Sequence, residues 1–362
     1  MQKIVEGIEK LQSILDSIGS HKLFMVIDSS YPFLNIKDSI EKTSQFKVFF
    51  SDFKPNPLYE DVCKGIDLFI KENCDSILAV GGGSSIDVAK CIKLAVLADE
   101  GRQGLIPPLV SKRLEMDGTR IPFIAIPTTA GTGSESTHNA VMYYQGSKQT
   151  VTNDGVLPDY ALLEPKVLTT LPLYQKKCTM MDAFCQGIES WWSVNATDES
   201  RDYAKTAVEM ITRYWRRYIV DNDQNAARQI MIAANYGGRA INISATTAAH
   251  AMSYKITSLY KLPHGHAVAV CLPEIWQYML EIEPDMPVFL DISRAMGFDS
   301  PRTAIAGFRE MMSEMGLKNP VSEDRETELE TLSKSVNPVR LKNNPIKIDE
   351  ATAWNLYNRI VM

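Results

Sequence analysis

The first half of the chain alternates short apolar runs with stretches of helical periodicity. Apolar runs at 23–27, 47–50, 77–80 and 122–127 predict strands, and helical patterns follow them. Because these strands are apolar throughout, both of their faces should be buried. The pattern therefore predicts a parallel sheet covered by helices on both sides.

Two helices in this half are predicted from their local sequence. The N-terminal segment MQKIVEGIEKLQSILDSIG spaces its apolar residues by four and three, which predicts an amphipathic helix that ends at Gly19. The segment PNPLYEDVCKGIDLFIKENC predicts a second helix, with Pro57 in its first turn.

From about Leu171 the pattern changes to long helical periods with little strand-like alternation. The helical segments are 175–193, 199–220, 223–260 and 265–282. A proline-marked stretch, EPKVLTTLP, separates the two halves. We therefore predict an α/β domain of residues 1–168 and an all-helical domain of residues 169–362.

Composition narrows the class of protein. The chain has 362 residues and a net charge of −6, with no basic tail or dense cluster of lysine and arginine, so nucleic acid is not an expected partner. No stretch approaches the roughly 20 apolar residues of a membrane span, and the N-terminus does not resemble a signal peptide. The six cysteines are scattered without a CxxC pair, which indicates reduced thiols and a cytoplasmic protein.

Two small-residue loops follow predicted strands. Residues 81–85, GGGSS, open a helix at the end of one strand, and residues 127–135, PTTAGTGSE, follow the next. Glycines allow close approach to a ligand, and free N–H groups at a helix start favour an anion such as a diphosphate. Either loop alone is also explained as a turn, but two at the carboxyl edge of one sheet favour a dinucleotide site. Neither matches GxGxxG.

Asp28, at the end of the first predicted strand, offers a carboxylate to the adenosine ribose. Its charge would repel a 2′-phosphate, which favours NAD(H) over NADP(H). A turn aspartate without a ligand explains the same residue equally well.

Histidines and one helix suggest a metal site. Asp182 and Gln186 are four residues apart and share one helix face, while His250 lies in a helical segment and His264 in a PHGH turn. Two imidazoles, a carboxylate and an amide oxygen are a ligand set for one divalent ion, with a position left for substrate. Taken singly, each histidine is more often structural.

Together, GGGSSIDVAK, PTTAGTGSE, the Asp182 helix and the spacing from His250 to PHG resemble the iron-containing (group III) alcohol dehydrogenase family, from about residue 20 to the C-terminus. The resemblance implies a Rossmann-like, dehydroquinate synthase-like nucleotide domain and a helical domain that binds metal and substrate. It also implies Fe²⁺ or Zn²⁺, held by Asp182, His250 and His264, and a homodimer. The cofactor-binding residues that it implies are Gly82, Gly83, Ser84, Asp87, Thr128, Thr129, Ser134 and Lys148. Asp28, at its strand end, and Thr132, in the second loop, are further candidates.

Two positions depart from the family pattern. Gln186 stands where most members carry a histidine ligand, and Tyr254 stands where many carry a further histidine. An amide oxygen is a weaker ligand than imidazole for iron or zinc, so metal affinity or ion preference should differ. The usual proton route must differ as well.

The strings DAFCQGIESWWSVNATDES, AAHAMSYKITSLYKLPHGHAVAV and SVNPVRLKNNP are similar to the phosphonoacetaldehyde reductase branch. This resemblance implies reduction of phosphonoacetaldehyde to 2-hydroxyethylphosphonate. The metal would polarise the aldehyde oxygen, the nicotinamide would deliver hydride, and Tyr254 or His266 would relay a proton. Lys255 and Lys261 are candidate phosphonate contacts, although solvated lysines are the more ordinary interpretation.

Three alternatives remain open from the sequence. The first is a reductase of an uncharged aldehyde, such as lactaldehyde or butanal, in the same family. The second is a related enzyme that acts on a phosphorylated polyol or cyclic sugar acid. The third is a nucleotide-binding protein whose metal site decayed at Gln186.

Overall fold

The computed structural model describes residues 2–97 and 121–362. Met1 and residues 98–120 of the predicted α/β domain lie outside the described residues. The chain divides into two compact units. The first contains residues up to Thr129 and Gly133–Leu171, and the second contains Ala130–Thr132 and Pro172–Met362.

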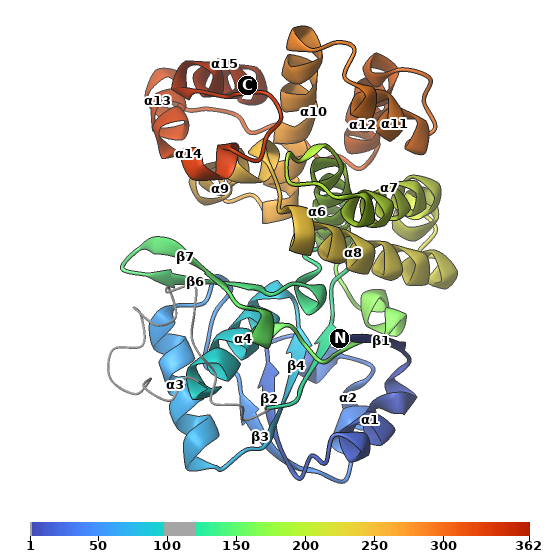
Figure 1. Ribbon diagram of the computed structural model, residues 1–362, viewed down its shortest axis with the longest axis vertical. Helices are drawn as coiled ribbons and strands as arrows, with labels where there is room; N and C mark the ends of the chain where they lie inside the picture. The colour runs from blue at the N-terminus through green and yellow to red at the C-terminus, as the bar shows by residue number, and fades with distance from the viewer. Residues whose placement is uncertain (1, 98–120) are drawn as a thin grey trace. The chain divides into compact units, whose positions relative to one another are not determined.

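The first unit is built from strands and short helices (Figure 1). Its strands are β1 (Lys3–Glu6), β2 (Lys22–Ile27), β3 (Phe46–Phe50), β4 (Ser76–Gly81), β5 (Phe123–Pro127), β6 (Asn139–Tyr144), β7 (Ser147–Thr152) and β8 (Tyr160–Leu163). Its helices are α1 (Leu11–Ser17), α2 (Lys37–Glu41), α3 (Tyr59–Lys71) and α4 (Gly83–Leu97). Short 3₁₀ turns are η1 (Ile8–Lys10), η2 (Tyr31–Phe33), η3 (Ser134–Ser136), η4 (Asp154–Val156) and η5 (Pro165–Thr169).

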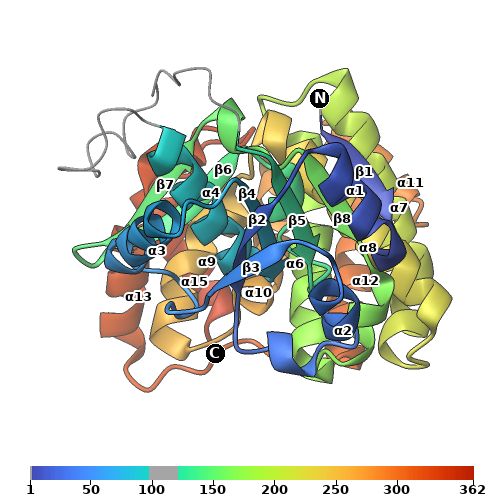
Figure 2. The ribbon, with the colours of Figure 1, turned by 90° about the horizontal axis from the view of Figure 1, so that it is seen from below.

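Six of the strands form one parallel sheet in the order β1-β8-β5-β4-β2-β3, and β6 pairs with β7 as an antiparallel hairpin. In Figure 2, α3 and α4 lie on one side of this sheet and α1 and α2 on the other. Phe24 and Val26 of β2 pack into the core below α3 and α4, while the alternate residues Leu23 and Met25 are also fully buried. The predicted parallel sheet, covered on both faces, is confirmed.

The sequence prediction was wrong at the N-terminus. Residues 3–6 form edge strand β1, paired with β8, and the helix begins only at Leu11. Gly7 has a φ of 96°, a left-handed conformation that separates the strand from the turn η1. The apolar residues of this segment are spaced as in a helix, but pairing with β8 makes residues 3–6 a strand.

A second correction concerns α3. The helix begins at Tyr59, so Pro57 precedes it rather than lying in its first turn. Asp61 supplies the cap instead, since its side chain accepts a hydrogen bond from the Leu58 N–H at 3.4 Å.

The second unit is helical throughout its described secondary structure. Its helices are α6 (Leu173–Trp192), α7 (Asp198–Ile219), α8 (Gln224–Ser244), α9 (Ala248–Tyr260), α10 (His264–Ile282), α11 (Pro287–Ala295), α12 (Pro301–Glu314), α13 (Arg325–Ser335), α14 (Pro338–Leu341) and α15 (Glu350–Ile360). In Figure 1, α7 and α8 lie side by side next to α6. Among the described residues, no helix combines the length and apolar character needed to cross a membrane.

The predicted segment 223–260 is two helices rather than one. Ala245 has a φ of 57° and ends α8, and α9 starts three residues later. A left-handed residue cannot continue an α-helix, so the chain turns at this point. This turn places His250 in the first turn of α9.

Candidate metal and cofactor site

Helix α6 carries three polar side chains along one face. Asp182, Gln186 and Glu189 stand at positions i, i+4 and i+7, and all three are buried. Every residue from Cys178 to Trp192 is buried, so these polar groups lie within protein rather than in solvent. Buried polar groups of this kind require hydrogen-bond, ionic or metal partners in the protein.

Asp182, His250 and His264 converge in the second unit. Each offers a ligand atom, and these atoms lie within 4.8 Å of one another. Asp182 Oδ1 is 3.3 Å from His250 Nε2 and 3.8 Å from His264 Nε2. The two imidazole rings meet edge to face, with centroids 5.4 Å apart.

A close helix contact sets the position of His264. The chain leaves α9 at Lys261, which has a φ of 53°, and enters α10 after Pro263. Gly265 is the second residue of α10. A Cβ at this position would lie 1.9 Å from the Cys178 carbonyl oxygen and 2.8 Å from Asp182 Cβ. Only glycine allows α10 to begin this close to α6, which brings His264 beside Asp182.

Gln186 lies on the same helix face as Asp182. Its Nε2 donates to the Thr132 carbonyl at 3.3 Å. Among the described residues, Gln186 Oε1 and His250 Nε2 are buried atoms without a hydrogen bond. Buried polar atoms without a hydrogen bond are costly unless a ligand satisfies them, and a carboxylate, two imidazoles and an amide oxygen fit a divalent cation.

Glu189 is the buried partner of His250. One of its oxygens accepts from His250 Nδ1, and burial leaves the carboxylate with no exposed surface. Burial lowers the pKa of His250, but the carboxylates of Glu189 and Asp182 outweigh that effect and raise the pKa to about 9. Sequence reasoning missed Glu189, although its spacing of seven residues from Asp182 was a usable signal.

Tyr254 and Arg340 extend the cluster on the side of His264. The Tyr254 ring is parallel to the His264 ring, and Arg340 Nη1 donates to the Tyr254 hydroxyl at 3.0 Å. The guanidinium carbon is also 5.0 Å from the Tyr254 ring centroid. Arg340 was not singled out from the sequence, although it lies within the quoted string SVNPVRLKNNP.

The other predicted polar residues of this unit are His266, Lys255 and Lys261. His266 is buried, with Nε2 bonded to the Lys318 carbonyl and Nδ1 to the Tyr174 hydroxyl, each at 2.9 Å. Burial lowers its pKa. Lys261 is the exposed residue that ends α9, and Lys255 is partly exposed. Among the described contacts, none joins either lysine to Asp182, His250 or His264.

In the first unit, three neighbouring strand ends bring the predicted cofactor loops together. Gly81 pairs with Pro127, and the Thr128 N–H donates to the Gly81 carbonyl at 3.0 Å. Asp28 Oδ2 accepts from Gly82 N at 3.4 Å and from Ser85 Oγ at 3.1 Å. Asp28 therefore holds the glycine loop at the carboxyl edge of the sheet, where Gly82, Gly83 and Ser84 are partly exposed.

A polar network ties α4 to the second loop and the hairpin. Asp87 accepts from Ser134 Oγ at 2.7 Å and from Val141 N at 3.1 Å. The buried Lys90 donates to Ser134, Thr137 and Asn139. Burial raises the pKa of Asp87 and lowers that of Lys90 to about 8. The positive charge of Lys148, on β7, lowers the pKa of Asp87, which places this lysine near the network.

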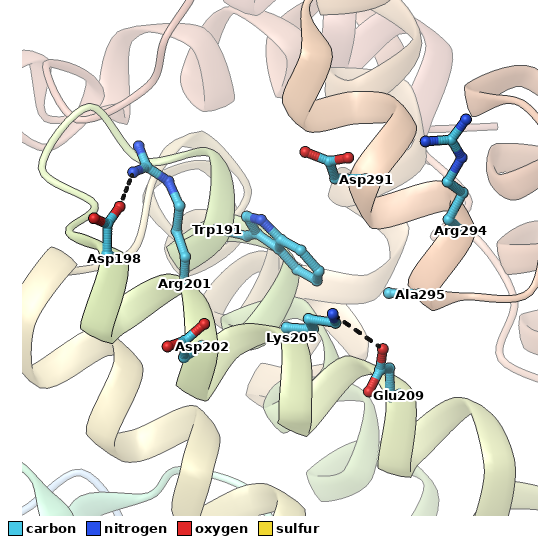
Figure 3. Close-up of a pocket in the computed structure, with 9 residues that line it drawn as sticks. All are labelled: Trp191, Asp198, Arg201, Asp202, Lys205, Glu209, Asp291, Arg294 and Ala295. Atoms are coloured by element: carbon cyan, nitrogen blue, oxygen red, sulfur yellow. Dashed lines mark hydrogen bonds and ion pairs between the residues drawn. The ribbon is translucent and has the colours of Figure 1, made fainter.

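A separate hollow of about 470 Å³ lies between α6, α7 and α11 (Figure 3). Trp191 forms part of its wall. Asp198 pairs with Arg201 and Lys205 with Glu209 on the α7 side, while Asp291 and Arg294 come from α11. Acidic and basic groups are interspersed, so the hollow presents no single charge. None of the predicted metal ligands lines it.

Comparison with protein families places both parts of the chain. Residues 2–165 match the model described as iron-containing alcohol dehydrogenase, and residues 177–361 match the C-terminal model of the Fe-containing alcohol dehydrogenase family. These matches cover the strand ends with the glycine loop and the helices that carry Asp182, His250 and His264.

Relatives of known function point the same way. The chain is 30% identical over 281 residues to the NAD-dependent methanol dehydrogenase of Bacillus methanolicus, which covers 76% of this chain and 72% of that protein. It is also 30% identical over 287 residues to the 1,3-propanediol dehydrogenase of Citrobacter freundii, covering 75% and 71%. A crystal structure of 1,3-propanediol oxidoreductase superposes with a TM-score of 0.90 at 25% identity, covering 99% of this chain and 97% of that one.

The fold and the Asp-His-His cluster thus define a metal-dependent oxidoreductase. The chain belongs to the iron-containing alcohol dehydrogenase family. It is therefore a metal-dependent alcohol dehydrogenase or aldehyde reductase.

Proposed function

We propose that this enzyme reduces phosphonoacetaldehyde to 2-hydroxyethylphosphonate. The proposal assigns an Fe²⁺ or Zn²⁺ ion to Asp182, Gln186, His250 and His264, and NAD(H) to the two loops of the sheet. The observation that supports an anionic substrate is the link from Arg340 to Tyr254 and from Tyr254 to His264.

Arg340 is better placed than either predicted lysine to bind the phosphonate. Its guanidinium contacts Tyr254, which stacks on a metal ligand, whereas Lys261 is an exposed helix end. A planar guanidinium matches two phosphonate oxygens at once, which a lysine ammonium does not. We therefore infer that Arg340, rather than Lys255 or Lys261, is the main contact of the phosphonate.

Different residues of this chain have different roles in the proposed reduction. The bound ion supplies a Lewis acid for the aldehyde oxygen. Asp182, His250 and His264 hold the ion, and Gln186 offers its unpaired Oε1 as a neutral fourth ligand. The hydroxyl of Tyr254 holds the proton that the product alcohol needs, and Arg340 orients that hydroxyl through its hydrogen bond. Glu189 keeps His250 oriented.

For the cofactor, the proposal favours NAD(H) over NADP(H). The Asp28 carboxylate lies at the end of β2 and holds Gly82 and Ser85, so its negative charge is fixed beside the glycine loop. A 2′-phosphate would meet that charge. The other loop residues that the proposal assigns to the cofactor are Gly82, Gly83, Ser84, Asp87, Thr128, Thr129, Thr132, Ser134 and Lys148.

Oxidation of NADH with phosphonoacetaldehyde and with propanal tests the substrate assignment. We expect kcat/KM to be higher for the phosphonate. Arg340→Met should lower that value about 10- to 100-fold, since hydrogen bonds to charged groups contribute about 1.5–3 kcal/mol, and should affect propanal much less. Lys255→Met serves as the matched control and should leave both values unchanged. A kcat/KM no better for the phosphonate than for propanal would overturn the assignment.

A second candidate is reduction of an uncharged short-chain aldehyde. Two relatives favour it, the NAD-dependent methanol dehydrogenase and the 1,3-propanediol dehydrogenase. Equal turnover of propanal by the wild type and by Arg340→Met, with little activity on the phosphonate, is the outcome expected of this candidate. A decayed, nucleotide-binding protein is distinguished by NADH binding without metal uptake or turnover.

A further inference from the structure

We propose that Glu189 is a positioning residue that sets the tautomer and direction of the His250 imidazole for metal binding. The inference rests on the proposed metal site, because it concerns how one of the three converging ligands is prepared. Glu189 itself lies behind His250 and does not belong to the Asp182, His250 and His264 cluster.

The two oxygens of Glu189 have different hydrogen-bond partners. Oε1 accepts from the Thr247 N–H at 3.1 Å, the Ala249 N–H at 2.8 Å, the His250 N–H at 3.3 Å and the Thr247 hydroxyl at 2.8 Å. It therefore caps the first turn of α9, where free N–H groups and the helix dipole stabilise a negative charge. These bonds give Glu189 Oε1 four donors in a position with no exposed surface.

Oε2 faces the imidazole and accepts from His250 Nδ1. A carboxylate only accepts hydrogen bonds, so the proton of neutral His250 must lie on Nδ1. The lone pair is then on Nε2, the atom that lies 3.3 Å from Asp182 Oδ1 and has no hydrogen bond among the described residues. Glu189 thus directs the metal-binding nitrogen of His250 toward the other ligands.

This arrangement requires acceptors on both sides of residue 189. A glutamine there would have one oxygen and one NH₂ group. If the oxygen caps α9, the NH₂ faces Nδ1–H, and His250 must move its proton to Nε2 or rotate away. If the amide is reversed, the NH₂ faces the N–H groups of the helix. Either orientation opposes donor to donor, so Glu189→Gln should impair the ligand while nearly preserving side-chain volume.

Thr247→Val is the matched control. It removes a hydroxyl that donates to Glu189 Oε1 and accepts from Trp192 Nε1 at 2.9 Å, but it leaves the contact between Oε2 and His250 Nδ1 in place. Both variants disturb the cap of α9, and only Glu189→Gln disturbs the imidazole. Comparing them separates positioning of the ligand from stability of the helix.

The experiment measures Zn²⁺ affinity of the metal-free full-length protein by competition with a chromophoric chelator, together with the melting temperature of each metal-free variant. We expect Glu189→Gln to weaken Zn²⁺ binding about 10- to 100-fold, the usual effect of losing such a partner. Thr247→Val should lower the melting temperature but leave Zn²⁺ affinity unchanged.

Asp182→Asn makes the two possible failures distinguishable. If Asp182→Asn binds Zn²⁺ like the wild type, the proposed metal site itself is wrong. If Asp182→Asn loses Zn²⁺ but Glu189→Gln retains wild-type affinity, the site stands and the role of Glu189 is overturned. Equal losses of affinity in Glu189→Gln and Thr247→Val would also overturn it, because they would show an effect of helix stability alone.

Discussion

The rings of Tyr254 and His264 lie parallel, with their centroids 5.5 Å apart and their planes inclined by 1°. The stack holds the phenol of Tyr254 next to one of the proposed metal ligands. Ring packing and the hydroxyl group can therefore be tested separately.

Tyr254→Phe keeps the ring and removes the hydroxyl that accepts from Arg340. If that hydroxyl supplies the proton, we expect kcat to fall about 100-fold, the lower range for general acid catalysis. Zn²⁺ affinity should not change, because the stacked ring remains. Steady-state turnover and a metal titration check both. An unchanged kcat would limit Tyr254 to packing against His264.

Gln186→His replaces a neutral amide ligand with an imidazole. Because imidazole is the stronger ligand for iron and zinc, we expect tighter binding of both ions. A gain of about tenfold corresponds to about 1.4 kcal/mol. Ion content after dialysis and a Zn²⁺ titration measure the change. Weaker binding in this variant would argue that residue 186 does not reach the ion.

Gly265→Ala tests the close contact between α6 and α10. The added Cβ would lie 1.9 Å from the Cys178 carbonyl, so α10 must shift and carry His264 with it. We expect a loss of about 1–3 kcal/mol in the free energy of unfolding, as for other overpacked sites, and weaker Zn²⁺ binding. Denaturant unfolding and metal titration provide the measurements.

Gly237→Ala is the control for this substitution. Its added Cβ would meet the Ala183 carbonyl of α6 at 3.4 Å and Gln186 Oε1 at 3.5 Å, which are ordinary van der Waals contacts between α8 and α6. Alanine favours helix more than glycine does, so stability should hold or rise. Similar losses in both variants would mean that the close approach at Gly265 has no special importance.

The buried Lys90 predicts a dependence of stability on pH. Its pKa in the folded protein is lowered to about 8 by burial, below that of an exposed lysine. Between pH 8 and the ordinary lysine pKa near 10.4, the unfolded chain therefore binds more protons, and stability should rise with pH. The contribution is on the order of 3 kcal/mol at most.

Unfolding of wild type and Lys90→Met by denaturant from pH 8 to 10.5 measures this contribution. The wild type should gain stability relative to the variant as the pH rises, because deprotonation removes the cost of a buried charge. Parallel profiles for the two proteins would contradict a lowered pKa for Lys90.

Sequence patterns predicted four of the six strands of the sheet, β2, β3, β4 and β5, because each is a run of mainly apolar residues. Strand β8 was not predicted. The start of the chain could not be predicted in this way. Residues 3–6 form a strand only because β8 offers an edge, and that pairing partner lies more than 150 residues away in the chain. The periodicity of a short segment cannot indicate a pairing partner so far away in the chain.

The metal cluster was predictable as a set of residues but not as an arrangement. The i, i+4 spacing of Asp182 and Gln186 gave one helix face, while the approach of His264 depends on contact of Gly265 with Cys178. Arg340 and Lys90 look like ordinary charged residues in the sequence. Their surroundings, a tyrosine ring for one and three polar partners for the other, come from tertiary structure.

Complete burial of α6 from Cys178 to Trp192 restricts how this enzyme can diverge. A helix without a solvent face tolerates few changes in side-chain size. The proposed metal site therefore cannot easily move to other positions of this helix. Its ion preference can change most readily through exchanges between groups of similar volume. Gln186→His is such an exchange, because it would add an imidazole ligand at one position and leave the rest of the helix unchanged.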